Sequence, residues 1–104
     1  MDLVTKVYRV TDSFPKREVY SLTDQIRRAA VSVPSNIAEG QAHFNQGEFV
    51  HFLRHSAGSL AELETQLLLA ERLEYAGHDQ IQSLLSLVSE VGKLLNGLIN
   101  SLRK

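Results

Sequence analysis

The residues of this chain with the clearest chemical potential are one glutamate and two histidines at helical spacing. Glu48, His51 and His55 fall at i, i+3 and i+7, so an α-helix would place them on one face. Glu-x-x-His supplies metal ligands in di-iron four-helix bundles, which need a second such pair and further carboxylates. The chain has no second Glu-x-x-His, and Glu48 is also placed to cap a helix. We interpret this face as solvated polar surface and expect neither a metal nor another cofactor.

Covalent catalysis finds no support in the pattern of nucleophiles. The chain has no cysteine, which excludes disulfides, thiolate metal sites and a cysteine nucleophile. Its serines are numerous, but none sits in the glycine-flanked turn of a nucleophile elbow. Glycine spacing typical of a phosphate-binding loop is also missing. We therefore expect a protein that is not an enzyme.

Five basic residues are the candidates for binding nucleic acid. They are Lys16, Arg17, Arg27, Arg28 and Arg54. In a ring of subunits such a patch would repeat, and its phosphate contacts would add up. The alternative is that these are ion-paired surface residues. Aromatic and basic residues are not interleaved in the way that base stacking favours.

A proline lies within an otherwise helical apolar pattern. The pattern predicts that the helix continues through Pro34 with a kink, although a helix restarting at Pro34 is the alternative. Ser32, Asn36 and Glu39 around it could form a binding notch. The interpretation we favour is a bent scaffold helix whose polar groups are satisfied locally. Gly40 is the expected end of this helix.

Apolar residues recur at helical spacing along nearly the whole chain. The predicted helices cover residues 2–13, 21–40, 46–74 and 79–102, with Ser21 and Asn45 as N-caps. Short connectors between four helices favour an antiparallel up-down-up-down four-helix bundle, in one domain over residues 1–104. The small residues Ala57, Gly58 and Ser59 are expected to let the third helix approach Ala29 and Ala30 of the second closely.

The third and fourth helices are apolar on more than one side. Leu67, Leu68 and Leu69 must point in three directions, and Leu94 belongs to a second row beside the main seam of the fourth helix. That seam is predicted to be Ile81, Leu84, Val88, Val91, Leu95, Leu98 and Leu102. We expect a homo-oligomer. A monomer with scattered exposed apolar residues is the alternative.

Composition sets the broad class. The 104 residues are 43% apolar and 22% charged, with a net charge of −1, as in an ordinary globular protein without a strong overall field. No run approaches the roughly 20 apolar residues that span a bilayer, and the N-terminus lacks the apolar core of a signal peptide. We expect a soluble cytoplasmic protein with no membrane partner.

Several blocks of this sequence together resemble one family. They are Phe14-Pro15, Tyr20-Ser21-Leu22, Gln25, Arg27-Arg28-Ala29, Ser32-Val33, Asn36-Ile37-Ala38-Glu39-Gly40, Glu48-Phe49, Phe52-Leu53, Ala57-Gly58-Ser59-Leu60, Glu62-Leu63-Glu64 and Gln66-Leu67. Over nearly its whole length the chain resembles the bacterial four-helix-bundle proteins encoded in intervening sequences of large-subunit ribosomal RNA genes. Pro34, Asn36, Glu39, Gly40 and Gly58 then belong to a structural signature.

The resemblance implies a four-helix bundle assembled as a homopentameric ring or barrel. A similar fold occurs in the accessory protein of diversity-generating retroelements, which engages a reverse transcriptase and nucleic acid. By likeness, the partners would be RNA, DNA or a nucleic-acid enzyme; the resemblance brings no catalytic residues. Arg27 and Arg28 match basic positions of the family. Where relatives often carry a basic residue, this chain has His43 and His51, which weakens phosphate binding at neutral pH.

Overall fold

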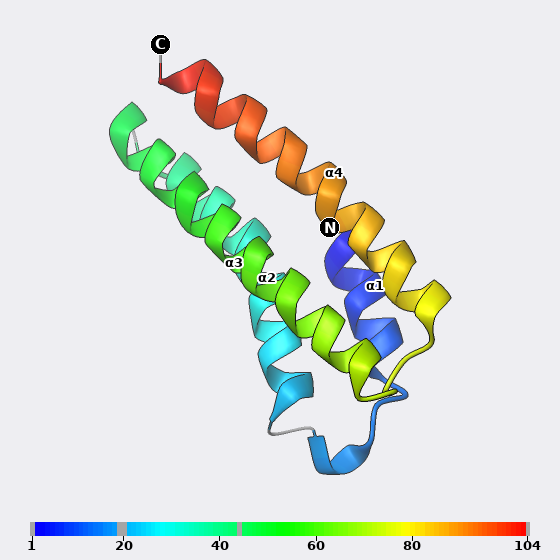
Figure 1. Cartoon of the computed structure of the whole chain (residues 1–104). Helices are drawn as coiled ribbons and strands as arrows, with labels where there is room; N and C mark the ends of the chain where they lie inside the picture. The colour runs from blue at the N-terminus through cyan, green and yellow to red at the C-terminus, as the bar shows by residue number, and fades with distance from the viewer. Residues whose placement is uncertain (1, 19–20, 44, 104) are drawn as a thin grey trace.

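The computed structural model describes residues 2–18, 21–43 and 45–103, and it is built from helices (Figure 1). The elements are α1 (Asp2–Thr11), the short 3-10 helix η1 (Lys16–Glu18), α2 (Leu22–Gln41), α3 (Gln46–Arg72) and α4 (His78–Leu102). No strand occurs in the described ranges. The predicted all-α, four-helix class is confirmed.

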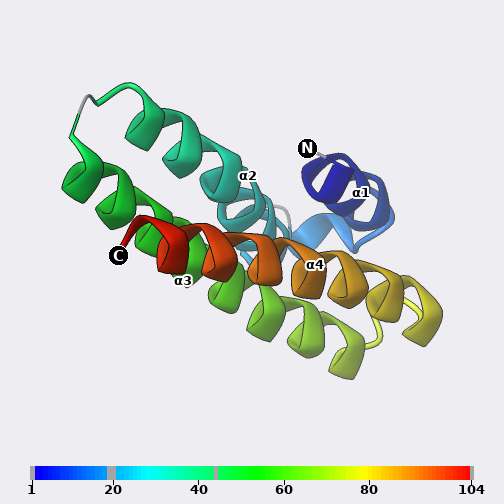
Figure 2. The same ribbon diagram turned by 90° about the horizontal axis from the view of Figure 1, so that it is seen from above.

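The helices form an elongated molecule with extents of 44 × 23 × 18 Å. α2 and α3 run antiparallel, because Ser32 contacts Ser59 whereas Gly40, later in α2, faces Phe49, earlier in α3. α4 lies along α3 in the opposite direction, and the short α1 lies beside α4 (Figures 1 and 2). α2 is helical without a break through Pro34. The kink at Pro34 and the up-and-down order across all four helices stay predictions.

One apolar cluster fills the space between the helices. Its members are Leu3, Val7, Val10, Phe14, Leu22, Ile26, Ala29, Ala30, Val33, Leu53, Leu60, Leu63, Leu67, Ala70, Ile81, Leu84, Val88, Leu95 and Ile99. The predicted seam of α4 is wrong near its end, where Ile99 is buried and Leu98 is 38% exposed. A strict seven-residue repeat drifts by about 20° per heptad on a straight helix. Over three heptads this drift turns Ile99 toward the core in place of Leu98.

The helix ends follow the predicted caps in part. The Oδ1 atom of Asn45 accepts a hydrogen bond from the backbone N–H of Glu48 at 3.0 Å, which confirms Asn45 as an N-cap. Ser21 precedes α2 at the predicted position, but its side chain makes no capping hydrogen bond. The predicted stop at Gly40 is wrong, because α2 continues to Gln41.

The third helix ends two residues earlier than its pattern predicts. α3 stops at Arg72, and Glu74 takes a left-handed backbone conformation with φ of 62°. The N–H of Tyr75 then donates to the carbonyl of Ala70 at 3.0 Å, which satisfies one of the last free carbonyls of the helix. Among the described residues, no helix has the length and hydropathy needed to cross a membrane.

Candidate functional site

The signature around Pro34 forms a hydrogen-bonded joint between α2 and α3. The side-chain amide of Asn36 donates to the carbonyl of Ser32 at 2.8 Å and lies 2.9 Å from the Ser32 hydroxyl. That hydroxyl lies 2.8 Å from the hydroxyl of Ser59 on α3. One turn away, the buried hydroxyl of Ser56 donates to the carbonyl of Val33 at 2.8 Å. These polar groups satisfy one another across the helix pair.

The joint favours the scaffold interpretation of the Pro34 segment over a binding notch. Ser32 and Asn36, two of the three notch residues, are half-buried and bonded to each other, while Glu39 is exposed. Pro34 has no N–H to give to the carbonyl of Ala30. Asn36 donates to Ser32 and does not fill this gap.

Gly40 and Gly58 have opposite surroundings, which corrects one prediction. A Cβ atom built on Gly40 would lie 2.9 Å from both Cδ1 of Phe49 and Cβ of Phe52, so only glycine allows α2 and α3 to meet this closely. A Cβ built on Gly58 would have nothing within 4 Å, and Gly58 is exposed. The prediction that Ala57, Gly58 and Ser59 let α2 approach is therefore wrong for Gly58, whose side of α3 points to solvent. It is borne out for Ser59, which contacts Ser32 of α2. Ser56 and Ser59 face α2 in its place.

The Arg27 side chain contacts two residues of α1. Its guanidinium carbon lies 4.7 Å from the ring centre of Tyr8, and its Nε donates to the Thr11 hydroxyl at 2.9 Å. A cation over an aromatic ring is attracted by the negative face of the ring. Because Arg27 is half-buried with these partners, its first role is to dock α1 on α2.

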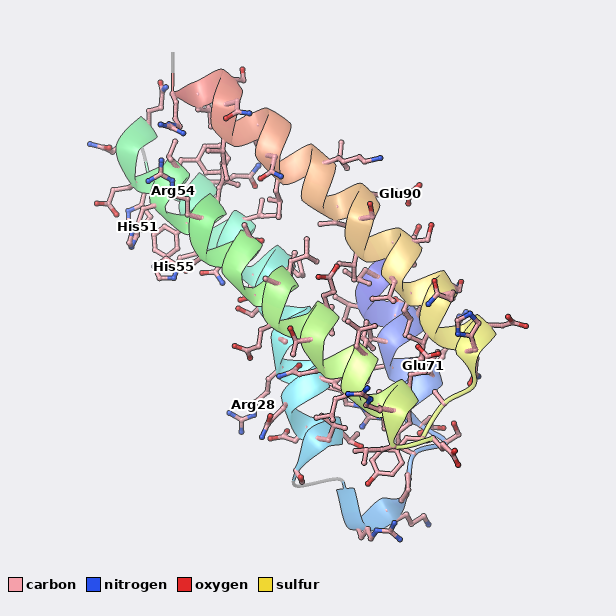
Figure 3. All side chains as sticks on the ribbon, in the orientation of Figure 1. Arg28, His51, Arg54, His55, Glu71 and Glu90 are labelled. Atoms are coloured by element: carbon pink, nitrogen blue, oxygen red, sulfur yellow. The ribbon has the colours of Figure 1, made fainter. Side chains whose placement is uncertain are left out.

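The other basic candidates are exposed but do not form one patch. Lys16 and Arg17 lie on η1, at the end of the molecule where α2 begins. The Arg28 side chain is 79% exposed, and its Nε donates to Asp24 at 2.8 Å. Figure 3 shows Arg54 well separated from Arg28, beside His51 and His55 on α3. Lys16, Arg17 and Arg28 thus belong to one end of the molecule and Arg54 to another region.

Exposed leucines gather in two separate places, apart from Tyr8 and Val31, which are 43% and 38% exposed. Leu68, Leu69 and Leu73, near the end of α3, are 46–48% exposed, and we name them the α3 patch. Leu94 and Leu98, in the last third of α4, are 74% and 38% exposed and form the α4 patch. Leu67 is fully buried whereas Leu68 and Leu69 are exposed, which confirms that α3 is apolar on more than one side. The end of α3 and the end of α4 lie at opposite ends of the molecule (Figure 1).

Two contacts at the surface were not foreseen from the sequence. Nδ1 of His78, the first residue of α4, lies 2.6 Å from the Glu71 carboxylate near the end of α3. The hydrogen bond and charge of Glu71 raise the pKa of His78 above its usual 6.5. On another face, the Nε2 atoms of His51 and His55 lie 3.1 Å apart. Spacing alone puts His51 and His55 on adjacent turns of α3 but does not fix their rotamers.

The chain is thus a four-helix protein. It has a hydrogen-bonded joint between α2 and α3 and exposed leucines on α3 and α4. The model of the 23S rRNA-intervening sequence protein family matches residues 1–97, and the chain belongs to this family. A similar solved structure is a protein of unknown function from the S23 ribosomal protein family of Bacteroides thetaiotaomicron. It is 25% identical, with a TM-score of 0.80, over 92% of this chain and 87% of that chain. No curated protein matches this chain significantly.

Proposed function

We propose that this protein is a non-enzymatic homo-oligomer that acts as a scaffold for RNA, DNA or a nucleic-acid-handling protein. The observation that carries the proposal is the pair of separate leucine patches, one near the end of α3 and one in the last third of α4. Exposed leucines gathered at two places are typical of surfaces that another molecule covers. The family resemblance gives the expected subunit number, a pentamer.

Two different patches favour a ring over a two-fold dimer. A two-fold dimer buries the same patch on both chains, whereas a head-to-tail contact pairs one patch with a different one on the next chain. The α3 patch and the α4 patch consist of different residues on different helices. Repeated pairing of the two patches closes into a ring when the rotation per subunit divides a full turn.

Light scattering of the purified chain tests the assembly. The expected mass is five times the chain mass of 11.6 kDa. A chain that is monomeric and folded at low concentration would contradict the proposed ring and the scaffold function that depends on it. Another closed number of subunits would keep the ring and replace the pentamer.

The basic residues at the α2 end are the proposed contact with nucleic acid. Lys16 and Arg17 are exposed, and Arg28 is held outward by Asp24. A ring would repeat this end in every subunit, so weak phosphate contacts would add. Arg27 is less suited, since Tyr8 and Thr11 already engage its guanidinium.

A salt series with labelled single-stranded RNA and duplex DNA tests this surface. We expect weaker binding in Lys16→Ala/Arg17→Ala and in Arg28→Ala. The slope of the log binding constant against log salt concentration should fall in magnitude by about one for each phosphate that is no longer neutralised. Lys93→Ala, which removes an exposed charge from α4, is the control. Unchanged affinity and slope in the first two variants would exclude this end as the contact surface.

A protein-only interaction module is the second candidate function. The net charge of −1 and the exposed leucines favour it, because neither provides a general attraction to phosphate. Partners that remain bound to the purified oligomer after nuclease treatment would support this candidate over the first.

A further inference from the structure

The Nε2 atoms of His51 and His55 lie next to each other on the surface of α3. Both residues are exposed, and they lie on successive turns of α3 (Figure 3). Their Nε2 atoms are 3.1 Å apart, although their ring centres are 4.4 Å apart. The Nε2 atoms are therefore on the sides of the two rings that face each other, and the ring planes make an angle of 85°.

This separation is that of two ligands on one metal ion. Imidazole nitrogens bind Zn²⁺ at about 2.0–2.1 Å, so two of them at angles of about 90–109° lie roughly 2.8–3.4 Å apart. The observed 3.1 Å falls in this range. A hydrogen bond between two neutral rings would also fit the distance, and it would occupy both Nε2 atoms.

An aromatic neighbour limits the freedom of both imidazoles. The Phe52 ring lies 5.6 Å from the His51 ring and 6.3 Å from the His55 ring, between centres. Phe52 is itself fixed by its close approach to Gly40 of α2. Because the rings are already held near their bound positions, less conformational entropy is lost when an ion binds.

We propose that His51 and His55 form a two-histidine site for one divalent transition-metal ion per chain, with water in the remaining coordination positions. Imidazole ligands suit Zn²⁺, Ni²⁺ and Cu²⁺ and not the oxygen-preferring Mg²⁺ or Ca²⁺. Within the described residues no cluster of three or more histidine, aspartate and glutamate side chains could hold a metal, so the protein supplies two ligands only. The site is accessible, since both imidazoles are exposed.

The flanking charges neither create nor prevent the site. Glu48 lies one turn before His51, and Arg54 lies between the two histidines in sequence on a neighbouring side of α3. These opposite charges offset each other, so affinity for a cation depends on the imidazole nitrogens. Neither nucleic-acid binding nor assembly is required for this site.

Calorimetric titration of the full chain with ZnCl₂ tests the proposal. The expected result is one ion per chain, with affinity weakened by at least about tenfold in His51→Gln and in His55→Gln. Glutamine keeps a polar side chain but is not a ligand of choice for these metals, so each variant removes one ligand and little else. Circular dichroism checks that each variant remains helical.

Two other histidines provide matched controls. His43→Gln removes an imidazole that stacks on Phe52 at 5.3 Å, and His78→Gln removes an exposed imidazole at the start of α4. Both variants are expected to bind Zn²⁺ like the parent chain. The proposal is overturned if the parent chain takes up no Zn²⁺ or if His51→Gln and His55→Gln bind it unchanged. Either result would leave the 3.1 Å contact as a hydrogen bond between two rings.

Discussion

Gly40 of α2 and Phe52 of α3 approach so closely that a Cβ atom on Gly40 would lie 2.9 Å from the Cβ atom of Phe52. A Cβ is the root of a side chain and cannot move aside without its backbone. The glycine that ends the Asn36–Gly40 block is thus a packing requirement.

Gly40→Ala should therefore destabilise the protein. Overpacking of a filled interface costs about 1–3 kcal/mol, which outweighs the roughly 1 kcal/mol that alanine gains over glycine in a helix. We expect a net loss of up to about 2 kcal/mol in the free energy of unfolding by urea, at fixed protein concentration.

Gly58→Ala is the matched control for that substitution. Its Cβ would meet nothing within 4 Å, so only the helix propensity changes, and the protein should gain about 0.5–1 kcal/mol. Equal effects of the two substitutions would contradict the tight contact at Gly40. A loss of stability at Gly58 accompanied by a lower oligomer mass would place Gly58 in a contact between subunits.

The contrast between these glycines shows what the sequence could predict. Helical spacing predicted the four helices, the Asn45 cap and most of the core. It could not tell Gly40 from Gly58, because the direction in which a helical glycine points depends on how the helix is rotated against its neighbour. The burial of Ile99 in place of Leu98 has the same origin, since small angular errors accumulate along α4.

The candidate sites were predictable to a smaller extent. The sequence placed His51 and His55 on one helical face, but the 3.1 Å contact depends on side-chain rotamers. The basic candidates were chosen by residue type. Type could not reveal that Tyr8 and Thr11 engage Arg27, because those residues come from α1 and are distant in sequence.

Glu74→Gly should stabilise the turn between α3 and α4. Glu74 has φ of 62°, a region that costs a residue with a side chain roughly 1–2 kcal/mol and costs glycine little. Glycine also has more freedom to lose on folding, so we expect a net gain of about 0.5–1 kcal/mol in urea unfolding. Glu74→Ala keeps the Cβ and is the control. A gain of the same size in Glu74→Ala would assign the effect to the removed charge.

The ion pair of His78 and Glu71 predicts a pH dependence with a definite sign. The folded-state pKa of His78 is raised above 6.5, chiefly by the hydrogen bond to Glu71 and then by the charge of that carboxylate. The stabilising contribution is fully present below pH 6.5, provided that Glu71 is ionised, and is lost as the pH rises through the raised pKa. Because the pair is exposed, its effect on stability should be small.

NMR titration of the His78 ring measures this shift directly. In Glu71→Gln the pKa of His78 should fall toward 6.5, since the carboxylate charge is gone. Glu90→Gln removes a carboxylate from the exposed face of α4 and should leave the titration of His78 unchanged. A His78 pKa that is the same with and without Glu71 would show that the pair does not persist in solution.

Head-to-tail assembly predicts that two variants, each with a different patch damaged, form a heterodimer when they are mixed. Leu69→Lys damages the α3 patch and Leu94→Lys damages the α4 patch, each by adding a charge that would have to be buried in the contact. Each variant alone should be monomeric by light scattering. Mixed in equal amounts they should form a dimer of one chain of each kind, because one α4 patch and one α3 patch remain intact and can pair.

A two-fold contact between identical patches predicts a different outcome. The variant with that patch intact would still dimerise alone, and mixing would recruit no second chain. Circular dichroism of each variant separates loss of assembly from loss of folding, since both leucines are exposed and their replacement leaves the buried core intact.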